Sequence, residues 1–138
     1  MSCARAVHHI ELWTRDLSSA EPAFAWLLDR LGWSAEHDPD WPSGRIWRHP
    51  AGVYLVLEQS PHVRDEAHDR LRPGMNHLAL CAADRETLDR IRAECAAHGW
   101  RELFAEAYPH AGGPQHTALF LEHPQGFEIE LVAEADGA

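Results

Sequence analysis

The chain has 138 residues, a formal net charge of −10 and eleven histidines. This length is enough for one compact unit with a buried core, whereas the acidic surplus and the lack of a Lys/Arg run argue against nucleic acid as a partner. No apolar run approaches the ~20 residues that span a bilayer, and the first residues lack the apolar core of a signal peptide. Cys3, Cys81 and Cys95 have no zinc-type spacing, so we expect reduced thiols in a cytoplasmic protein.

The first half of the chain predicts one strand, one helix and three further strands. Residues 6–14 alternate with a period of two, which is typical of a strand. Ser18 and Glu21 match a capping box and predict the start of a helix, and Gly32 is expected to end it. Three shorter strands are then expected near residues 33–37, 45–49 and 53–58.

The second half predicts the same succession of elements. Residues 60–74 combine prolines and alternating charges without apolar periodicity, and are predicted to be a linker. A helix from an N-cap at Asp84 to Gly99 is expected next, after a first strand. The strands are expected near residues 75–82, 100–105, 116–122 and 127–132. The single domain is thus predicted to hold module one at 6–59, module two at 75–133 and a disordered tail at 134–138.

Three sequence landmarks occur twice in the same order, at offsets of 68, 67 and 74 positions. They are His9–Asp16 with His77–Asp84, Leu31-Gly32-Trp33 with His98-Gly99-Trp100, and His49-Pro50-Ala51-Gly52 with His123-Pro124-Gln125-Gly126. An internal repeat of this kind indicates a duplicated module. We therefore predict an α+β fold in which two tandem βαβββ modules form a curved mixed sheet with a concave face that no helix covers.

The repeat also predicts a metal site. His9 and His77 open corresponding strands, and Glu130 lies in the last strand with its side chain on the same open face. Two imidazoles and a carboxylate suit Zn, Ni, Mn, Co or Fe(II), and they leave coordination positions open for a substrate. A single histidine in a strand is more often solvated than a ligand, so this prediction depends on the duplicated register.

These residues resemble the vicinal oxygen chelate superfamily, also called the glyoxalase/bleomycin resistance protein/dioxygenase family. The resemblance covers nearly the whole chain, about residues 6–132, and is fairly specific for fold and metal site. It is carried by His9–Leu12 with Asp16-Leu17, by Asn76–Leu80, and by Phe120–Leu131. The family usually shows Asp-Pro-Asp-Gly where this chain has His123-Pro124-Gln125-Gly126, a change in a surface turn that is not expected to affect chemistry.

The resemblance implies one divalent metal on His9, His77 and Glu130, and often a homodimer. In the family the metal chelates two adjacent oxygens of a small-molecule substrate and stabilises the enolate or oxyanion that forms. Glyoxalases of the family have a fourth ligand, for which Glu58 is the candidate, although Val56 is the position that matches Glu130. Glu58 is also the first choice as general base, with Glu11 or Glu128 in reserve, and a solvated strand end is the alternative.

Further residues are candidates to line the pocket, each with a plain structural alternative. For the aromatic residues the alternative is packing against the sheet, for the two histidines a solvated loop, and for the cysteine a small filler. The candidates are Glu11, Trp13, Trp47, Tyr54, Cys81, His110, His116 and Glu128.

Two classes of function follow. The first is a metal-dependent enzyme, a glyoxalase-like lyase or isomerase or a dioxygenase, between which the sequence does not decide. The second is a metal-free protein that sequesters an aromatic antibiotic, as bleomycin-resistance relatives do. Intact ligand positions favour the enzyme, whereas six Trp favour the binder. A fosfomycin-type thiol transferase ranks last, because the loop around Gly112-Gly113 lacks Lys and Ser.

Overall fold

The computed structural model describes residues 6–64 and 66–133. The chain divides into two compact units, residues 1–67 and 68–138, and each has one four-stranded mixed sheet. Both units follow the order β-α-β-β-β, so the predicted α+β fold with two repeated modules is confirmed. Cys3 and the tail 134–138, for which a thiol and disorder were predicted, lie outside the described residues.

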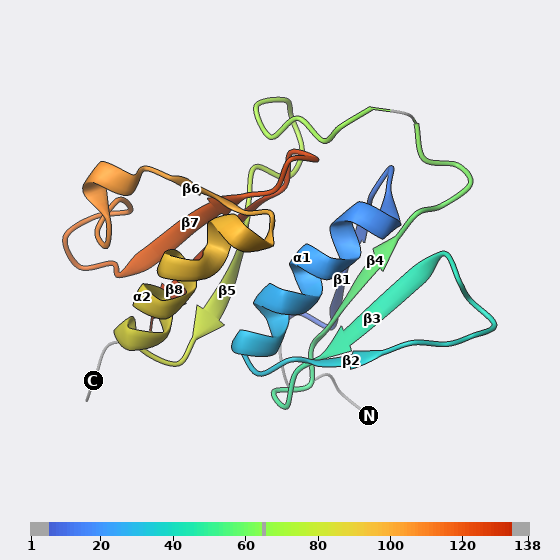
Figure 1. Cartoon of the computed structure of the whole chain (residues 1–138), viewed down its shortest axis with the longest axis horizontal. Coiled ribbons are helices and arrows are strands. Elements are labelled where there is room, and N and C mark those ends of the chain that lie inside the picture. The colour runs from blue at the N-terminus through green and yellow to red at the C-terminus, as the bar shows by residue number, and fades with distance from the viewer. Residues whose placement is uncertain (1–5, 65, 134–138) are drawn as a thin grey trace. The chain divides into compact units, whose positions relative to one another are not determined.

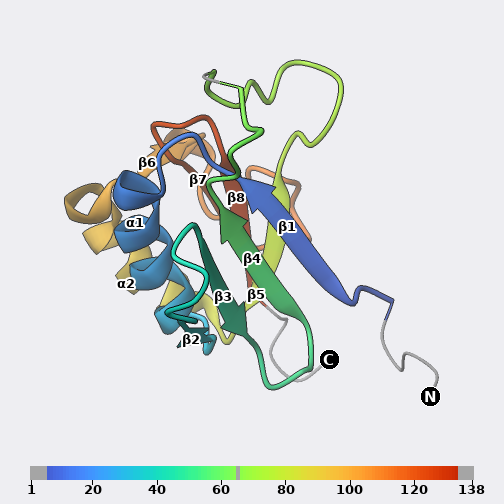
Figure 2. The same cartoon turned by 90° about the vertical axis from the view of Figure 1, so that its right-hand side faces the viewer.

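The first unit has its helix on one face of the sheet. It runs β1 (His9–Trp13), α1 (Leu17–Arg30), β2 (Ser34–Glu36), β3 (Gly44–Arg48) and β4 (Tyr54–Glu58). The strand order is β1-β4-β3-β2, with β1 parallel to β4 and the other neighbours antiparallel. Helix α1 lies along the sheet (Figures 1 and 2), and the apolar core of the unit forms between them. That core includes Phe24, Leu27, Leu28, Leu55 and Leu57.

The second unit repeats this arrangement with two short 3₁₀ turns added. It runs β5 (Leu78–Ala82), α2 (Arg85–Glu94), η1 (Cys95–His98), β6 (Arg101–Leu103), η2 (Ala105–Ala107), β7 (Ala118–Glu122) and β8 (Glu128–Ala133). The strand order is β5-β8-β7-β6, with β5 parallel to β8. Leu80, Leu88, Ile91, Leu119 and Leu131 are buried in its core. None of the described helices is long and apolar enough to cross a membrane.

The first helix begins at a different cap from the one predicted. The N-cap is Asp16, whose carboxylate accepts hydrogen bonds from the backbone N–H of Ser19 (3.4 Å) and the hydroxyl of Ser18 (2.8 Å). The N-cap of α2 is Asp84, as predicted, which accepts from the N–H of Thr87 at 2.8 Å. The Asp that ends each copy of the first landmark therefore caps both helices. The repeat was a better guide than the local capping-box match.

The other two landmarks of the repeat pack on each other inside each unit. Trp33 meets the ring of His49 edge-on with centroids 5.2 Å apart, and Trp100 meets His123 in the same way at 5.4 Å. In both hairpins the histidine Nδ1 accepts a hydrogen bond from the backbone N–H two residues on. We call these contacts the His–Trp pairs. They tie the end of each helix to the hairpin between the last two strands.

Part of the predicted linker packs on the second unit. The backbone N–H of His68 donates to the carbonyl of Gln125 at 3.0 Å, and the His68 ring stacks on Phe127 at 5.6 Å. The backbone of His68 also lies directly over Gly126, which has a φ of +94°. Gly126 therefore has two reasons to lack a side chain: its left-handed backbone and the close approach of the carbonyl of His68.

Gly126→Ala is expected to destabilise the protein more than Gly74→Ala does, by roughly 1–3 kcal/mol, the usual cost of overpacking. Both glycines have positive φ, but a Cβ at Gly74 would meet nothing within 4 Å. Urea unfolding of the two variants measures the difference. Equal costs would show that the segment at His68 does not pack on this hairpin.

Burial of His123 predicts a loss of stability at acid pH. Its side chain is buried, and desolvation lowers its pKa below the ordinary value. The unfolded chain therefore takes up a proton near pH ~6.5 while the folded chain does not. Stability from this group is complete above about pH 6.5 and declines below it, until the pH passes the folded-state pKa.

His123→Asn is expected to flatten this part of the stability profile, because Asn can still accept from the N–H of Gln125 but does not titrate. The measurement is the urea midpoint between pH 5 and 8, compared with His37→Asn, which removes an exposed histidine of the other unit. A wild-type slope that persists in His123→Asn would contradict the assignment.

Candidate functional site

In the first unit the open face, the face of the sheet opposite α1, carries five of the predicted site residues. His9 and Tyr54 are partners in the parallel β1–β4 ladder, and their rings stack with centroids 4.7 Å apart and an interplanar angle of 3°. Arg48 is the partner of Tyr54 in the antiparallel β3–β4 ladder, and its guanidinium lies 4.9 Å from the centroid of the Tyr54 ring. The ring of His9 is therefore held against the ring of Tyr54, and the residue is exposed to solvent.

Two carboxylates face each other further along the same strands. Glu58 pairs in register with Trp13, and its carboxyl group hydrogen-bonds that of Glu11, which also accepts from the indole N–H of Trp13. Burial raises the pKa of Glu58, and the hydrogen bond and negative charge of Glu11 raise it further. A carboxyl group with a raised pKa can take up and release a proton closer to neutral pH. The acid–base role of Glu58, with Glu11 in reserve, stays a prediction.

Trp47 is a correction to the predicted pocket lining. It pairs with Leu55 in the β3–β4 ladder, on the face covered by α1, and only 2% of its surface is exposed. Successive side chains of a strand point to opposite faces, so Trp47 and its neighbour Ile46 lie on different faces of the sheet. The sheet-packing alternative is therefore the correct one for Trp47.

In the second unit three predicted site residues meet on the open face, the one opposite α2. Glu130 is buried, with 6% of its surface exposed. Its Oε1 lies 3.0 Å from Nε2 of His77, and its Oε2 makes a short hydrogen bond with Nε2 of His116. His77 precedes β5 and His116 precedes β7, so two strand starts and the centre of β8 bring these groups together.

The ring of His77 is also held at its other nitrogen, by a hydrogen bond with Asn76. Nδ2 of Asn76 donates to the carbonyl of Arg70 at 3.0 Å, which directs Oδ1 of the amide toward Nδ1 of His77 at 2.7 Å. Since an amide oxygen only accepts, Nδ1 carries the proton. Nε2 is therefore the atom of His77 that can bind a metal, as is usual when the other ring nitrogen donates to a neighbour.

The donor atoms fit a divalent metal in kind and spacing. Two donors about 2.1 Å from one ion are about 3.0 Å apart at a right angle and about 3.4 Å apart at the tetrahedral angle, and Nε2 of His77 lies 3.0 Å from Oε1 of Glu130. Within residues 6–64 and 66–133, no three or more His, Cys, Asp or Glu side chains form a complete metal-binding group. His9 belongs to the first unit, and each unit is described by itself.

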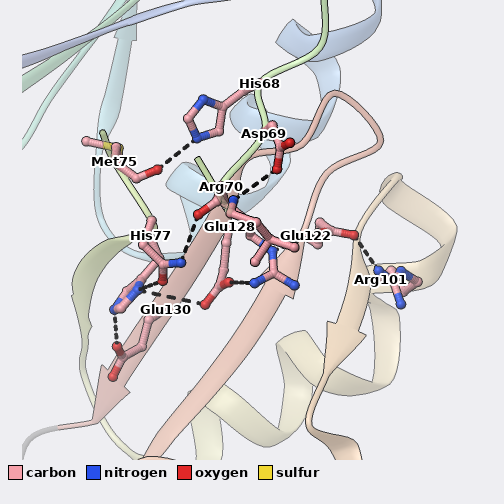
Figure 3. A network of polar contacts seen from close by, with 11 residues as sticks. His68, Asp69, Arg70, Met75, His77, Arg101, Glu122, Glu128 and Glu130 are labelled. Carbon is pink, nitrogen blue, oxygen red and sulfur yellow. Dashed lines mark hydrogen bonds and ion pairs between the residues drawn. The ribbon is translucent and has the colours of Figure 1, made fainter. Parts of the chain in front are cut away.

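An ion-pair network lies beside this cluster (Figure 3). Arg70 contacts Glu122 through Nε and Glu128 through Nη1, both at 3.0 Å, and Arg101 forms an ion pair with the other oxygen of Glu122. Burial tends to raise the pKa of Glu122, but the hydrogen bonds and charges of Arg101 and Arg70 outweigh it and hold the pKa below its usual value. The nearly buried Glu128 has Arg70 as an ion-pair partner without a well-directed hydrogen bond. It is held by the network and is not placed as a free base.

An apolar cluster covers the rest of this face. Leu103, Ala118 and Phe120 are buried together, and Ala111 and Val132 pack on them. Phe120 is the register partner of Glu130, and it meets the ring of His77 edge-on at 6.2 Å.

Phe104 extends this apolar surface toward solvent. It has a φ of +57°, which is rare for a residue with a side chain, and it meets Phe120 edge-on at 5.4 Å with 46% of its surface exposed. Cys81 is exposed on the same face of β5, opposite Val132. Phe120 and Phe104 thus lie beside the cluster of His77, His116 and Glu130.

Sequence reasoning missed two residues that hold the site together, Arg70 and Asn76. Arg70 lies in the predicted linker, and Asn76 was noted only as part of the family resemblance. His110 and His116 were both candidates to line the pocket, but His116 reaches Glu130, whereas His110 bonds the backbone carbonyl of His116. The predicted strand 116–122 already places residues 116, 118 and 120 on one face.

Comparison with known proteins decides the family. The model of the Glyoxalase/Bleomycin resistance protein/Dioxygenase superfamily matches residues 8–120. The chain belongs to this superfamily. The uncharacterized protein YqjT of Bacillus subtilis is 37% identical over 129 residues, which are 92% of this chain and 98% of that protein.

Solved structures agree with this assignment. A candidate glyoxalase from Bacillus halodurans is 32% identical, with a TM-score of 0.84 over 95% of this chain and 97% of that one. A fosfomycin resistance protein from Mesorhizobium loti is 12% identical, with a TM-score of 0.63 over 97% of this chain and 95% of that one, and so shares the fold. The resemblance inferred from the sequence motifs is therefore confirmed at the level of the superfamily.

Arg70→Gln is expected to lower the free energy of unfolding by roughly 3 kcal/mol, the order typical when a buried ion pair loses one partner. The reason is that Glu128, with 3% of its side chain exposed, loses its cation. Adding Glu128→Gln should restore part of the loss. Arg72→Gln is the control, because this exposed arginine pairs with Asp69 at 3.4 Å and should cost less than about 0.5 kcal/mol. No rescue by Glu128→Gln would contradict the assigned role of Arg70.

Proposed function

We propose that the protein is a divalent-metal-dependent enzyme of its superfamily that acts on a small oxygenated metabolite. The observation that carries the proposal is the pairing of Nε2 of His77 with Oε1 of the buried Glu130, 3.0 Å apart on the open face of the second unit. The contact of Nδ1 with Asn76 occupies the other ring nitrogen of His77, so Nε2 is the nitrogen proposed as a metal ligand. The candidate glyoxalase from Bacillus halodurans, 32% identical, supports the same class.

His77 and Glu130 would hold the metal, and His9 of the first module is the proposed third ligand. When bound, the metal supplies Lewis-acid stabilisation of negative charge on a chelated oxygen. Glu58, whose pKa is raised by burial and by Glu11, is the group proposed to hold and move the substrate proton. The proposal also includes Glu58 as the candidate fourth ligand of the metal.

The reaction proposed is that of a glyoxalase-like lyase or isomerase, or of a dioxygenase. The metal proposed is one of Zn, Ni, Mn, Co and Fe(II), since two imidazoles and a carboxylate suit each of them. A homodimer that works in the cytoplasm on a small-molecule substrate is part of the same proposal.

A second candidate function is binding of an aromatic antibiotic without a metal. The exposed rings of Trp13 and Phe104, 45% and 46% exposed on the open faces of their units, favour it. Aromatic surface of this kind suits a planar ligand. Arg48 over Tyr54 adds a cationic edge to the first unit.

Metal content and calorimetric titration separate the two functions. Wild-type protein is expected to bind one of the five metals near-stoichiometrically, and His77→Ala is expected to lose most of this binding because it removes a ligand. His98→Ala, which removes an exposed histidine of the same unit, should bind as the wild type does. If the wild type binds no metal, the enzyme proposal fails. Quenching of Trp fluorescence by aromatic antibiotics would then test the binder.

A further inference from the structure

The two oxygens of Glu130 have different partners. Oε1 lies beside Nε2 of His77, whose other ring nitrogen contacts Asn76, whereas Oε2 is taken by the short hydrogen bond with Nε2 of His116. Rotation of the carboxylate would break both contacts. The two carboxylate oxygens of Glu130 are therefore not interchangeable.

The loop that carries His116 is fixed at both ends. At its start Tyr108 donates a hydrogen bond from its hydroxyl to Asp89 of α2 at 2.7 Å, and burial, together with Asp89, raises the pKa of Tyr108 to about 12. At its end the N–H of Ala118 donates to the carbonyl of Pro109 at 2.9 Å. These contacts give the loop a defined course, in contrast to the solvated loop considered from the sequence.

Inside the loop the backbone is built around the imidazole of His116. Its N–H donates to the carbonyl of Gly113 at 3.1 Å, and its carbonyl accepts from Nδ1 of His110 at 3.1 Å. A Cβ at Gly112 would lie 2.6 Å from Cδ2 of the His116 ring. Gly112 has no positive φ, so the ring, and not the backbone angle, is what requires a residue without a side chain here.

We propose that His116 is a positioning residue that holds Oε2 of Glu130, so that Oε1 alone is presented to the metal next to Nε2 of His77. The inference rests on the proposed function and adds a residue to it. Hydrogen bonds to a ligating carboxylate orient the ligand and commonly contribute 10–100-fold to metal affinity. His116 acts through Glu130 and is not itself a ligand, since its Nε2 is engaged with the oxygen turned away from His77.

The test compares zinc affinity in the full chain with that of variants at His116. His116→Ala is expected to bind zinc 10–100-fold more weakly than the wild type. His116→Gln should recover most of the affinity, because its amide can place an N–H donor near the position of Nε2. The number of imidazole nitrogens on zinc, measured by X-ray absorption, should be the same in the wild type and in His116→Ala. His98→Ala is the control for loss of a histidine.

Gly112→Ala provides a second test that leaves every histidine in place. Its Cβ should displace the ring of His116 and reduce zinc affinity in the same direction as His116→Ala. Gly113→Ala is its matched control, since a Cβ there meets nothing within 4 Å although its φ of +130° adds strain. Loss of affinity in Gly113→Ala equal to that in Gly112→Ala would overturn the role given to the ring.

The contact between His116 and Glu130 is also measurable without metal. A double-mutant cycle of His116→Ala and Glu130→Gln on urea unfolding should show coupling between the two side chains. No coupling, unchanged zinc affinity in His116→Ala, or an imidazole count lower by one would each overturn the inference while wild-type metal binding still supports the proposed function. Absence of zinc and of the other metals from the wild type would instead overturn the proposed function and the inference with it.

Discussion

Carboxylates on a largely buried sheet face need partners, and this constraint organises the second unit. Glu122, Glu128 and Glu130 alternate along two strands on the same face. A buried carboxylate is costly unless hydrogen-bonded or paired. Arg70 and Arg101 meet this need for the first two, whereas the polar partners of Glu130 among residues 6–64 and 66–133 are the imidazoles of His77 and His116. An imidazole can exchange its contact with a carboxylate for a shared metal, which an arginine cannot do. The arginine network thus holds Glu122 and Glu128, and leaves Glu130 as the carboxylate proposed to bind a metal.

The architecture could be predicted from the sequence because it depends on local patterns that occur twice. Alternation, the capping Asp84 and the glycines after each helix are local signals, and the repeat allows one copy to check the other. The same check would have placed the first N-cap at Asp16 instead of Ser18. Strand ends were predicted less well, as β7 begins at Ala118 and not at residue 116.

The site could be predicted only in part. His77 and Glu130 follow from alternation within regular strands, and the structure brings them together. Arg70, Asn76 and His116 reach the site from irregular segments, whose course depends on contacts distant in the sequence, such as Tyr108 with Asp89. Trp47 was misplaced because an aromatic residue in a strand suits either face, and only the position of the helix decides between them.

The His–Trp pairs have a consequence for how such a chain can assemble and evolve. Trp33 with His49 and Trp100 with His123 each join two segments of the same unit. Neither contact requires a residue from the other unit, so each module closes its own helix onto its own hairpin. A duplicated module with this internal closure holds its helix and its hairpin together with its own residues. After gene duplication, residues on one open face can therefore diverge while this closure persists in both modules.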